Sequence, residues 1–300
     1  MTKDKLGIIY ALIAATSMGT TAIFTKITYS MGATPLTILT IRFGIASVIL
    51  WVYLYLKKQL EAVKKDRLIG LIALGLIYGI SSFMYFTSID MTSASIATLL
   101  VNTAPVFVVL TTVLIGDEKA TLHQVVAIFV ASVGLYLVLD LSVEAINLVG
   151  AVIGIGGGFF YGLYIVGSNR YAATLNPLLA TAYTVPATFL FHFSVGTASH
   201  QLSWELPPLV WAYGIILAVF GTIIGIGFVQ KSIPLIGSTK TSVIITFEPA
   251  VTVLLAALIF HEHMTPLQLL GGTLIIGAII IIQISKTEVN KQQDLSIPKG

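Results

Sequence analysis

The sequence predicts an all-α integral membrane protein with ten transmembrane helices, arranged as two inverted five-helix repeats around a central cavity. The chain has 300 residues, of which 56% are hydrophobic and only 10% are charged, whereas a soluble domain carries about 25% charged residues. Its apolar runs are long enough to cross a bilayer. One of them also repeats an earlier run that lies 144 positions before it.

The apolar runs divide into ten spans, because a transmembrane helix needs about 20 mostly apolar residues. We place the spans at residues 7–25, 35–56, 68–88, 93–115, 121–139, 147–167, 177–197, 207–229, 239–260 and 266–285. The first run is too long for a signal peptide and lacks a clear cleavage site. Helices are required, since unpaired strands cannot cross lipid.

The basic residues predict the orientation of these spans. If the N-terminus is cytoplasmic, fourteen of the sixteen Lys and Arg residues fall inside, and only Lys26 and Arg42 do not. The positive-inside rule therefore favours an even number of spans with both termini in the cytoplasm. The expected location is the cell (cytoplasmic) membrane.

The repeat relates residues 239–262 to residues 95–118 without gaps. Pro105 corresponds to Pro249 and both stretches end in Glu, at Glu118 and Glu262. Each proline removes an amide donor and clashes with a carbonyl one turn earlier, so a fixed or moving helix kink is expected at each.

The repeat divides the chain into a first unit, residues 1–141, and a second unit, residues 146–287. Residues 288–300 form a tail that we expect to be cytoplasmic and without fixed structure. Because each unit holds five spans, an odd number, the second unit must be inserted upside down relative to the first. Inverted repeats around a central site are the architecture of alternating-access transporters.

These features resemble a known family. The two five-helix halves, the mid-span prolines and terminal Glu residues of spans 4 and 9, the sequence IRF at 41–43 and FEP at 247–249 are similar to the EamA-type subgroup of the drug/metabolite transporter superfamily. The resemblance covers about residues 5–287. It implies a substrate cavity between the halves, opened alternately by paired movement of spans 3–4 and 8–9.

Glu248 has no counterpart in the first unit, where Ala104 occupies the equivalent position. A carboxyl group at membrane depth is costly and marks a functional site by default. One interpretation is a proton or cation site, or a partner for a substrate amine. The other is a structural Glu whose hydrogen bonds satisfy groups that Pro249 frees.

Polar side chains on one helix face suggest the cavity lining. Tyr78, Ser81, Ser82 and Tyr85 follow the spacing i, i+3, i+4, i+7. Hydroxyl groups of the first span (Thr16, Ser17, Thr20, Thr21) could join them. The candidate substrate-binding residues are Tyr78, Ser81, Tyr85, Asn102, Tyr161 and Tyr164. For each one, the alternative is an ordinary interhelical hydrogen bond.

Two basic residues could face the cavity. Arg42 lies about two turns inside span 2, where it could bind a substrate carboxylate or fix the end of the helix. Lys240 lies one turn into span 9. A glycine stripe, Gly150, Gly154, Gly158 and Gly162, allows close packing within the chain or between chains, so monomer and dimer both remain open.

Several function classes lack their sequence signatures. There is no phosphate-binding loop for direct ATP drive, no Cys, no expected metal or cofactor site, no catalytic constellation and no nucleic-acid footprint. The predicted function is a secondary transporter that moves small organic metabolites, amino acids above all, as an exporter. Its partners would be the substrate, the bilayer and protons as the candidate coupling ion. The alternatives are a multidrug or other permease of the same fold, an intramembrane enzyme or a non-transporting scaffold.

Overall fold

The computed structural model describes residues 2–92, 94–117, 121–138, 147–260, 266–267, 269–278 and 281. Within them the chain is helical and has no β-strand. The helices are α1 (Lys3–Met18), α2 (Thr21–Ser30), α3 (Pro35–Leu56), α4 (Lys65–Met91), α5 (Ala94–Val101), α6 (Ala104–Leu114), α7 (Leu122–Val138), α8 (Leu148–Tyr171), α9 (Pro177–Ala198), α10 (Pro208–Ile216), the π-helix η1 (Leu217–Ile224), α11 (Gly225–Ile245) and α12 (Glu248–Phe260). A further helix covers Leu269–Ala278.

Six stretches of the described chain are long and apolar enough to cross a membrane. They are Lys3–Ser30, Pro35–Leu56, Lys65–Met91, Leu148–Tyr171, Pro177–Ala198 and Pro208–Ile245. The predicted spans 93–115, 121–139 and 266–285 fall on shorter apolar helices, and span 239–260 is divided between the end of α11, which continues from span 207–229, and α12. The count of ten spans stays a prediction. Glu118 and Glu262, which end the two repeated stretches, lie outside the described residues, as does the tail.

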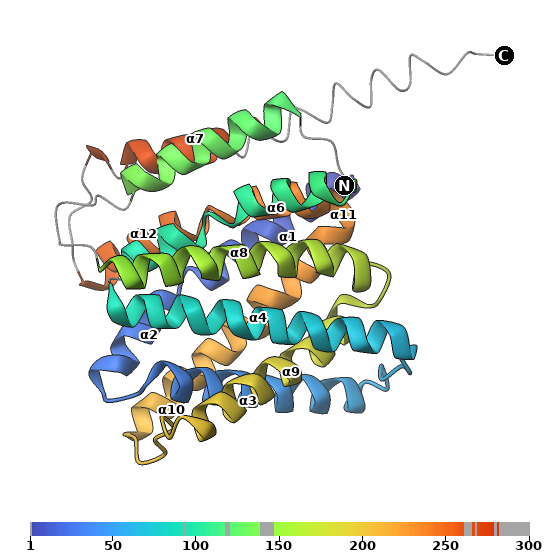
Figure 1. Cartoon of the computed structure of the whole chain (residues 1–300), viewed down its shortest axis with the longest axis vertical. Coiled ribbons are helices and arrows are strands. Elements are labelled where there is room, and N and C mark those ends of the chain that lie inside the picture. Colours follow the sequence, from blue (N-terminus) through green and yellow to red (C-terminus); the bar gives the residue numbers. More distant parts are fainter. Residues whose placement is uncertain are drawn as a thin grey trace.

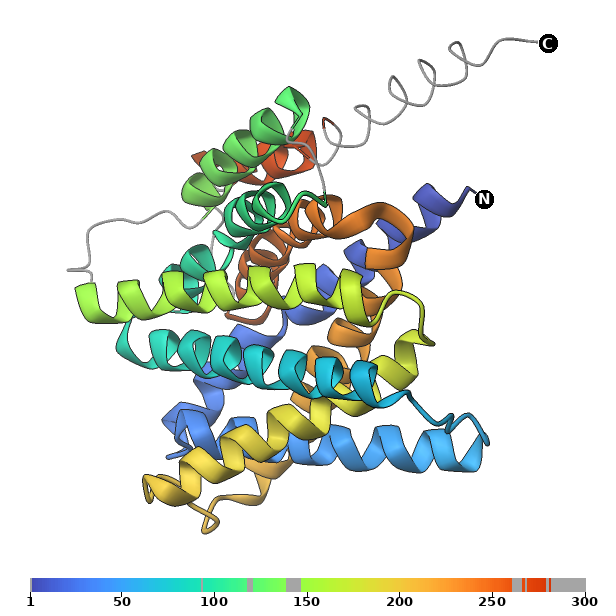
Figure 2. The same cartoon turned by 45° about the vertical axis from the view of Figure 1, so that its right-hand side comes forward.

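The long helices run side by side (Figure 1). α4 packs between α8 and α9, α1 packs along α11, and α3 packs against α9. α7 and Leu269–Ala278 lie together at one edge, far from α3 and α9 in both views (Figures 1 and 2). The core is thus built from helices of both halves of the sequence.

The glycine stripe of α8 is used within the chain. A Cβ on Gly154 would lie 2.8 Å from Leu100 Cβ, and one on Gly158 would lie 2.9 Å from Val101 O. Side chains larger than hydrogen would therefore push α5 away from α8. This close packing accounts for the stripe without a second copy of the chain.

The two prolines stand at helix starts rather than inside kinked helices. α5 ends at Val101 and α6 begins at Ala104, while α11 ends at Ile245 and α12 begins at Glu248. Each proline therefore occupies the first turn of a new helix, where its missing N–H would have no partner in any case. The expected kinks are complete breaks, directly before Pro105 and Pro249.

Other interruptions were not expected from the sequence. The first span divides between Met18 and Thr21, and the helix after Pro208 becomes π-helical over Leu217–Ile224. Gly237 has φ 81° inside α11, a conformation that glycine adopts without steric cost. The backbone there turns from one helix into the next.

Candidate functional site

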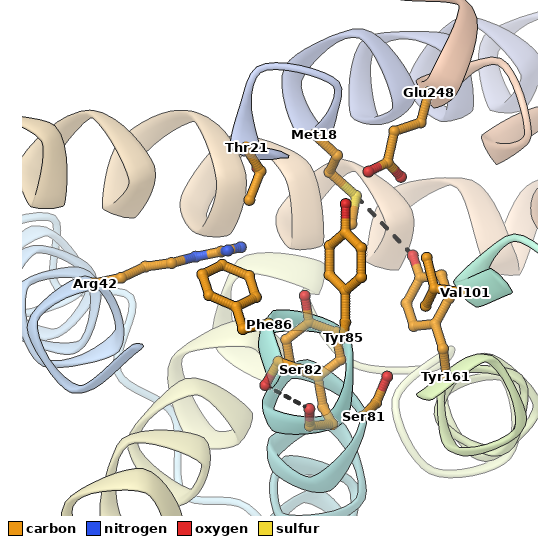
Figure 3. Close-up of a pocket in the computed structure, with 11 residues that line it drawn as sticks. Met18, Thr21, Arg42, Ser81, Ser82, Tyr85, Phe86, Val101, Tyr161 and Glu248 are labelled. Carbon is orange, nitrogen blue, oxygen red and sulfur yellow. Dashed lines mark hydrogen bonds between the residues drawn. The ribbon is translucent and has the colours of Figure 1, made fainter. Parts of the chain in front are cut away.

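A buried cavity lies where α1, α2, α3, α4, α5, α8 and α12 meet (Figure 3). Its volume is ≈ 40 Å³, enough for about three waters at roughly 10–15 Å³ each. The lining residues are Met18, Thr21, Arg42, Tyr78, Ser81, Ser82, Tyr85, Phe86, Val101, Tyr161 and Glu248. None is more than 9% exposed. This space is smaller than a metabolite.

Arg42 brings a buried positive charge to this cavity from α3. Its side chain is 2% exposed, its Nε donates to Thr222 Oγ1 at 2.7 Å, and its Nη2 donates to Gly221 O at 2.8 Å. The guanidinium carbon also lies 5.0 Å from the centre of the Phe43 ring. These contacts, together with the Tyr78 hydroxyl that lies within hydrogen-bonding reach, fix the guanidinium group beside the cavity.

The π-helix η1 supplies both acceptors that hold Arg42. A Cβ on Gly221 would lie 2.9 Å from Arg42 Nη2, so the guanidinium can reach this backbone only at a glycine. Ser17 Oγ donates to Phe220 O at 2.7 Å in the same segment. A π-helix forms bonds from i to i+5 and is frequent at functional sites. Here it turns backbone carbonyls toward α1 and α3.

Glu248 is the first residue of α12, and its carboxyl group points into the cavity (Figure 3). The side chain is 5% exposed. Its backbone carbonyl accepts from Thr252 Oγ1 at 3.1 Å, but in the described part of the chain no hydrogen bond or ion pair reaches the carboxyl group. The hydrogen-bonded structural role considered from the sequence is therefore not seen at this carboxyl.

Tyrosines and serines of α4 form the wall between these charges. Ser81 Oγ donates to Gly157 O at 2.9 Å, Tyr85 Oη lies 2.9 Å from Thr98 Oγ1, and Tyr161 Oη lies 4.0 Å from Met18 Sδ. Four predicted residues, Tyr78, Ser81, Tyr85 and Tyr161, thus line one cavity together with Arg42 and Glu248.

Three predicted residues do not line the cavity. Asn102 Nδ2 donates to Thr98 O at 2.9 Å, so its amide satisfies the end of α5. Tyr164 accepts from Gln230 Nε2 at 2.8 Å and packs behind Tyr78, with ring centres 4.8 Å apart. Lys240 lies half-buried in α11, outside the lining.

The apolar lining residues Met18, Phe86 and Val101 were not predicted from the sequence. Nothing in residue type separates them from core side chains. His192 Nε2 lies 3.2 Å from Ser82 Oγ, directly behind the cavity wall. The sequence signal for this contact is Ser82, a polar residue on the face of α4 that packs against α9.

Comparison with known proteins identifies the family. A model of the EamA-like transporter family matches the chain twice, over residues 5–140 and 148–284. The chain belongs to the EamA-like transporter family. It is therefore a multi-pass membrane transporter, as the sequence predicted.

Relatives that are named as transporters match this chain over nearly their whole length. An uncharacterized transporter of Bacillus subtilis (strain 168), YyaM, is 28% identical over 95% of this chain and 97% of its own. The threonine/homoserine exporter RhtA of Escherichia coli (strain K12) is 24% identical over 94% of this chain and 91% of its own. A crystallised protein with 15% identity shares the fold, with a TM-score of 0.78 over 93% of this chain and 96% of that one.

Proposed function

We propose that the protein is a secondary transporter that exports zwitterionic metabolites, amino acids in particular, across the cytoplasmic membrane by alternating access. The observation that carries this function is a pair of opposite charges, Arg42 and Glu248, which enter one buried cavity without pairing with each other. A family member named for threonine and homoserine export supports the substrate class and direction.

The two charges fit the two ends of an α-amino acid. Burying an unpaired charge is costly, so each cavity charge gains when a ligand brings its complement. The guanidinium group of Arg42 suits a carboxylate, and the carboxyl group of Glu248 suits an ammonium. The hydroxyl groups of Ser81, Tyr78 and Tyr85 can bind a polar side chain.

Equivalent contacts support two structurally related halves, residues 1–141 and 146–287. Ser232 Oγ donates to Gly7 O at 2.9 Å, and Ser88 Oγ donates to Gly150 O at 2.9 Å. These residues correspond at offsets of 144 and 143 positions. A hydrogen bond from the second half to the first is thus matched by one from the first half to the second, as a two-fold relation between inverted halves requires.

Glycine contacts repeat the same relation. A Cβ on Gly7 would lie 2.6 Å from Ile236 Cγ2, and one on Gly150 would lie 2.7 Å from Thr92 Cγ2. Near the cavity, a Cβ on Gly19 would lie 3.0 Å from Glu248 O, and the corresponding one on Gly162 would lie 3.2 Å from Ala104 O. The twofold match of the family model agrees with this division.

These contacts define two junctions that could act as gates. The inner junction is Gly7 with Ser232 and Ile236, and the outer junction is Gly150 with Ser88 and Thr92. The starts of α1 and α8 lie at opposite ends of the drawn helices (Figure 1). Both junctions are packed and the cavity measures only ≈ 40 Å³, as the occluded step of such a cycle would need. Opening one junction at a time would give alternating access.

Uptake by the purified protein in liposomes tests the substrate class. Threonine carries both charges, 1-aminopropan-2-ol lacks the carboxylate, and 3-hydroxybutyrate lacks the amine. We expect threonine to be transported at least about tenfold faster than either analogue, since a hydrogen bond to a charged group contributes roughly 1.5–3 kcal/mol. Protein-free liposomes are the control. Equal rates for all three compounds, or no uptake of any amino acid in a panel, would reject the zwitterion site.

A further inference from the structure

A second pocket lies between α3, α9, η1 and α11, and it shares no residue with the central cavity. Its volume of ≈ 260 Å³ exceeds that of the central cavity. The proposed transport mechanism does not use this pocket. Ile49, Leu50, Ile223 and Ile224 supply aliphatic walls. Ile49 is 39% exposed, so the pocket opens between spanning helices toward the surrounding lipid.

Lys231 is the single charged residue in this lining. Its Nζ lies 4.5 Å from the centre of the Phe228 ring and 5.7 Å from that of Tyr10. Among the described residues no carboxylate forms an ion pair with it. Aromatic faces compensate an ammonium only in part, so Lys231 retains donors for an anionic group at the mouth of an apolar pocket.

Gly227 borders the open space of the pocket. A Cβ built there would meet no heavy atom within 4 Å, in contrast to most glycines of the spanning helices, which allow a neighbouring helix to approach. This glycine therefore faces space rather than a packed neighbour. The pocket lies toward the end of the molecule that holds the N-terminus, which the sequence predicts to be cytoplasmic.

We infer that this pocket binds one anionic phospholipid of the inner leaflet, with its phosphate on Lys231 and one acyl chain along Ile49, Leu50 and Ile224. An apolar pocket beside a single ammonium matches an amphiphile with a negative head group. Basic residues near the cytoplasmic surface attract anionic lipids, and basic pockets between spanning helices bind their head groups. Since the pocket is separate from the cavity, this site does not depend on the transported substrate.

Lipid titration of the full-length protein in detergent tests the site, with the midpoint of thermal unfolding as the readout. Dioleoylphosphatidylglycerol should raise the midpoint of the wild type more than dioleoylphosphatidylcholine does. Lys231→Gln should weaken the phosphatidylglycerol response about fivefold, by the contribution of one basic residue near anionic lipid. Gly227→Leu should abolish it by filling the pocket.

Two matched variants control for non-specific effects. Lys57→Gln removes a basic residue outside the pocket lining, and Gly272→Leu adds a side chain at another glycine with no heavy atom within 4 Å. Both should respond to phosphatidylglycerol as the wild type does. An unchanged response in Lys231→Gln and Gly227→Leu, an equal response to phosphatidylcholine, or stabilisation by free oleate alone would each overturn the assignment.

Discussion

The helix breaks before Pro105 and Pro249 have the same backbone arrangement, but the side chain that precedes the proline differs between them. In the first half the new helix begins at Ala104, and in the second it begins at Glu248. The glycines that face these two residues make matching contacts with their carbonyl oxygens. Under the proposed division into two halves, the backbone is alike at the two breaks, while the carboxyl group in the cavity occurs in the second half only.

Arg42 departs from the repeat in the same way. It is the eighth residue of α3, which begins at Pro35, and the eighth residue of α9, which begins at Pro177, is Thr184. The hydroxyl of Thr184 bonds within its own helix, to Ala180 O at 3.1 Å. Matched junctions at both ends suit a device that opens on either side, and unmatched charges at the centre suit a ligand with two different ends.

Removing the positive charge should give the largest effect. We expect Arg42→Met to lower threonine transport roughly 10- to 150-fold, the equivalent of one charge-assisted hydrogen bond. It also leaves Gly221 O and Thr222 Oγ1 without their donor, so Arg42→Lys should recover part of the activity. Transport is measured in proteoliposomes, with the exposed Lys26→Met as the control. Wild-type rates in Arg42→Met would show that the guanidinium does not touch the substrate.

Glu248→Ala makes the second half equal to the first at this position. Because the carboxyl group makes no hydrogen bond in the described chain, its loss should leave the melting temperature near the wild-type value while threonine transport falls about tenfold or more. A large drop in melting temperature would instead assign Glu248 to the structure. Glu248→Gln separates coupling from binding: if its remaining transport responds to a pH gradient as the wild type does, this residue is not the proton site.

A larger side chain at the inner junction should favour the inward-open state, and one at the outer junction should favour the outward-open state. Thr21 lines the cavity, its hydroxyl has no hydrogen-bond partner among the described residues, and the chain has no native Cys. Thr21→Cys is therefore a mild reporter for an impermeant maleimide. Adding Gly7→Leu should open the inner junction and favour labelling from the side of the N-terminus, and Gly150→Leu should favour the other side.

Gly272→Leu, which meets no neighbour, should change the labelling on neither side. If the Gly7→Leu and Gly150→Leu variants were labelled from the same side, the inner and outer junctions could not be alternate gates.

We expect the smallest effect from removing either of the two equivalent hydrogen bonds, Ser88 to Gly150 and Ser232 to Gly7. Ser88→Ala and Ser232→Ala each remove one interhelical bond, which contributes about 0.6 kcal/mol on average in membrane proteins. We expect the two variants to lose similar stability in thermal unfolding. A loss confined to one of them would show that the two junctions are not equivalent in energy.

The helical, membrane-spanning character of the fold was readable from hydropathy, because lipid leaves few alternatives to helices. The positions of Pro105 and Pro249 located both central breaks. The π-helix was not predictable from local sequence patterns, and neither was its contact with Arg42, which reaches Gly221 O from a helix 179 positions away in sequence. Spacing on α4 identified the hydroxyl wall, but it could not show that Asn102 and Tyr164 bond to Thr98 and Gln230 instead.

The central claim is that Arg42 and Glu248 each recognise one end of a zwitterion. The direct measurement is the uptake of threonine, 1-aminopropan-2-ol and 3-hydroxybutyrate by the wild type, Arg42→Met and Glu248→Ala. Arg42→Met should lose the preference for threonine over the amine, and Glu248→Ala should lose the preference for threonine over the hydroxy acid. If both variants keep the wild-type preferences, the two charged residues do not recognise the carboxylate and ammonium groups of the substrate.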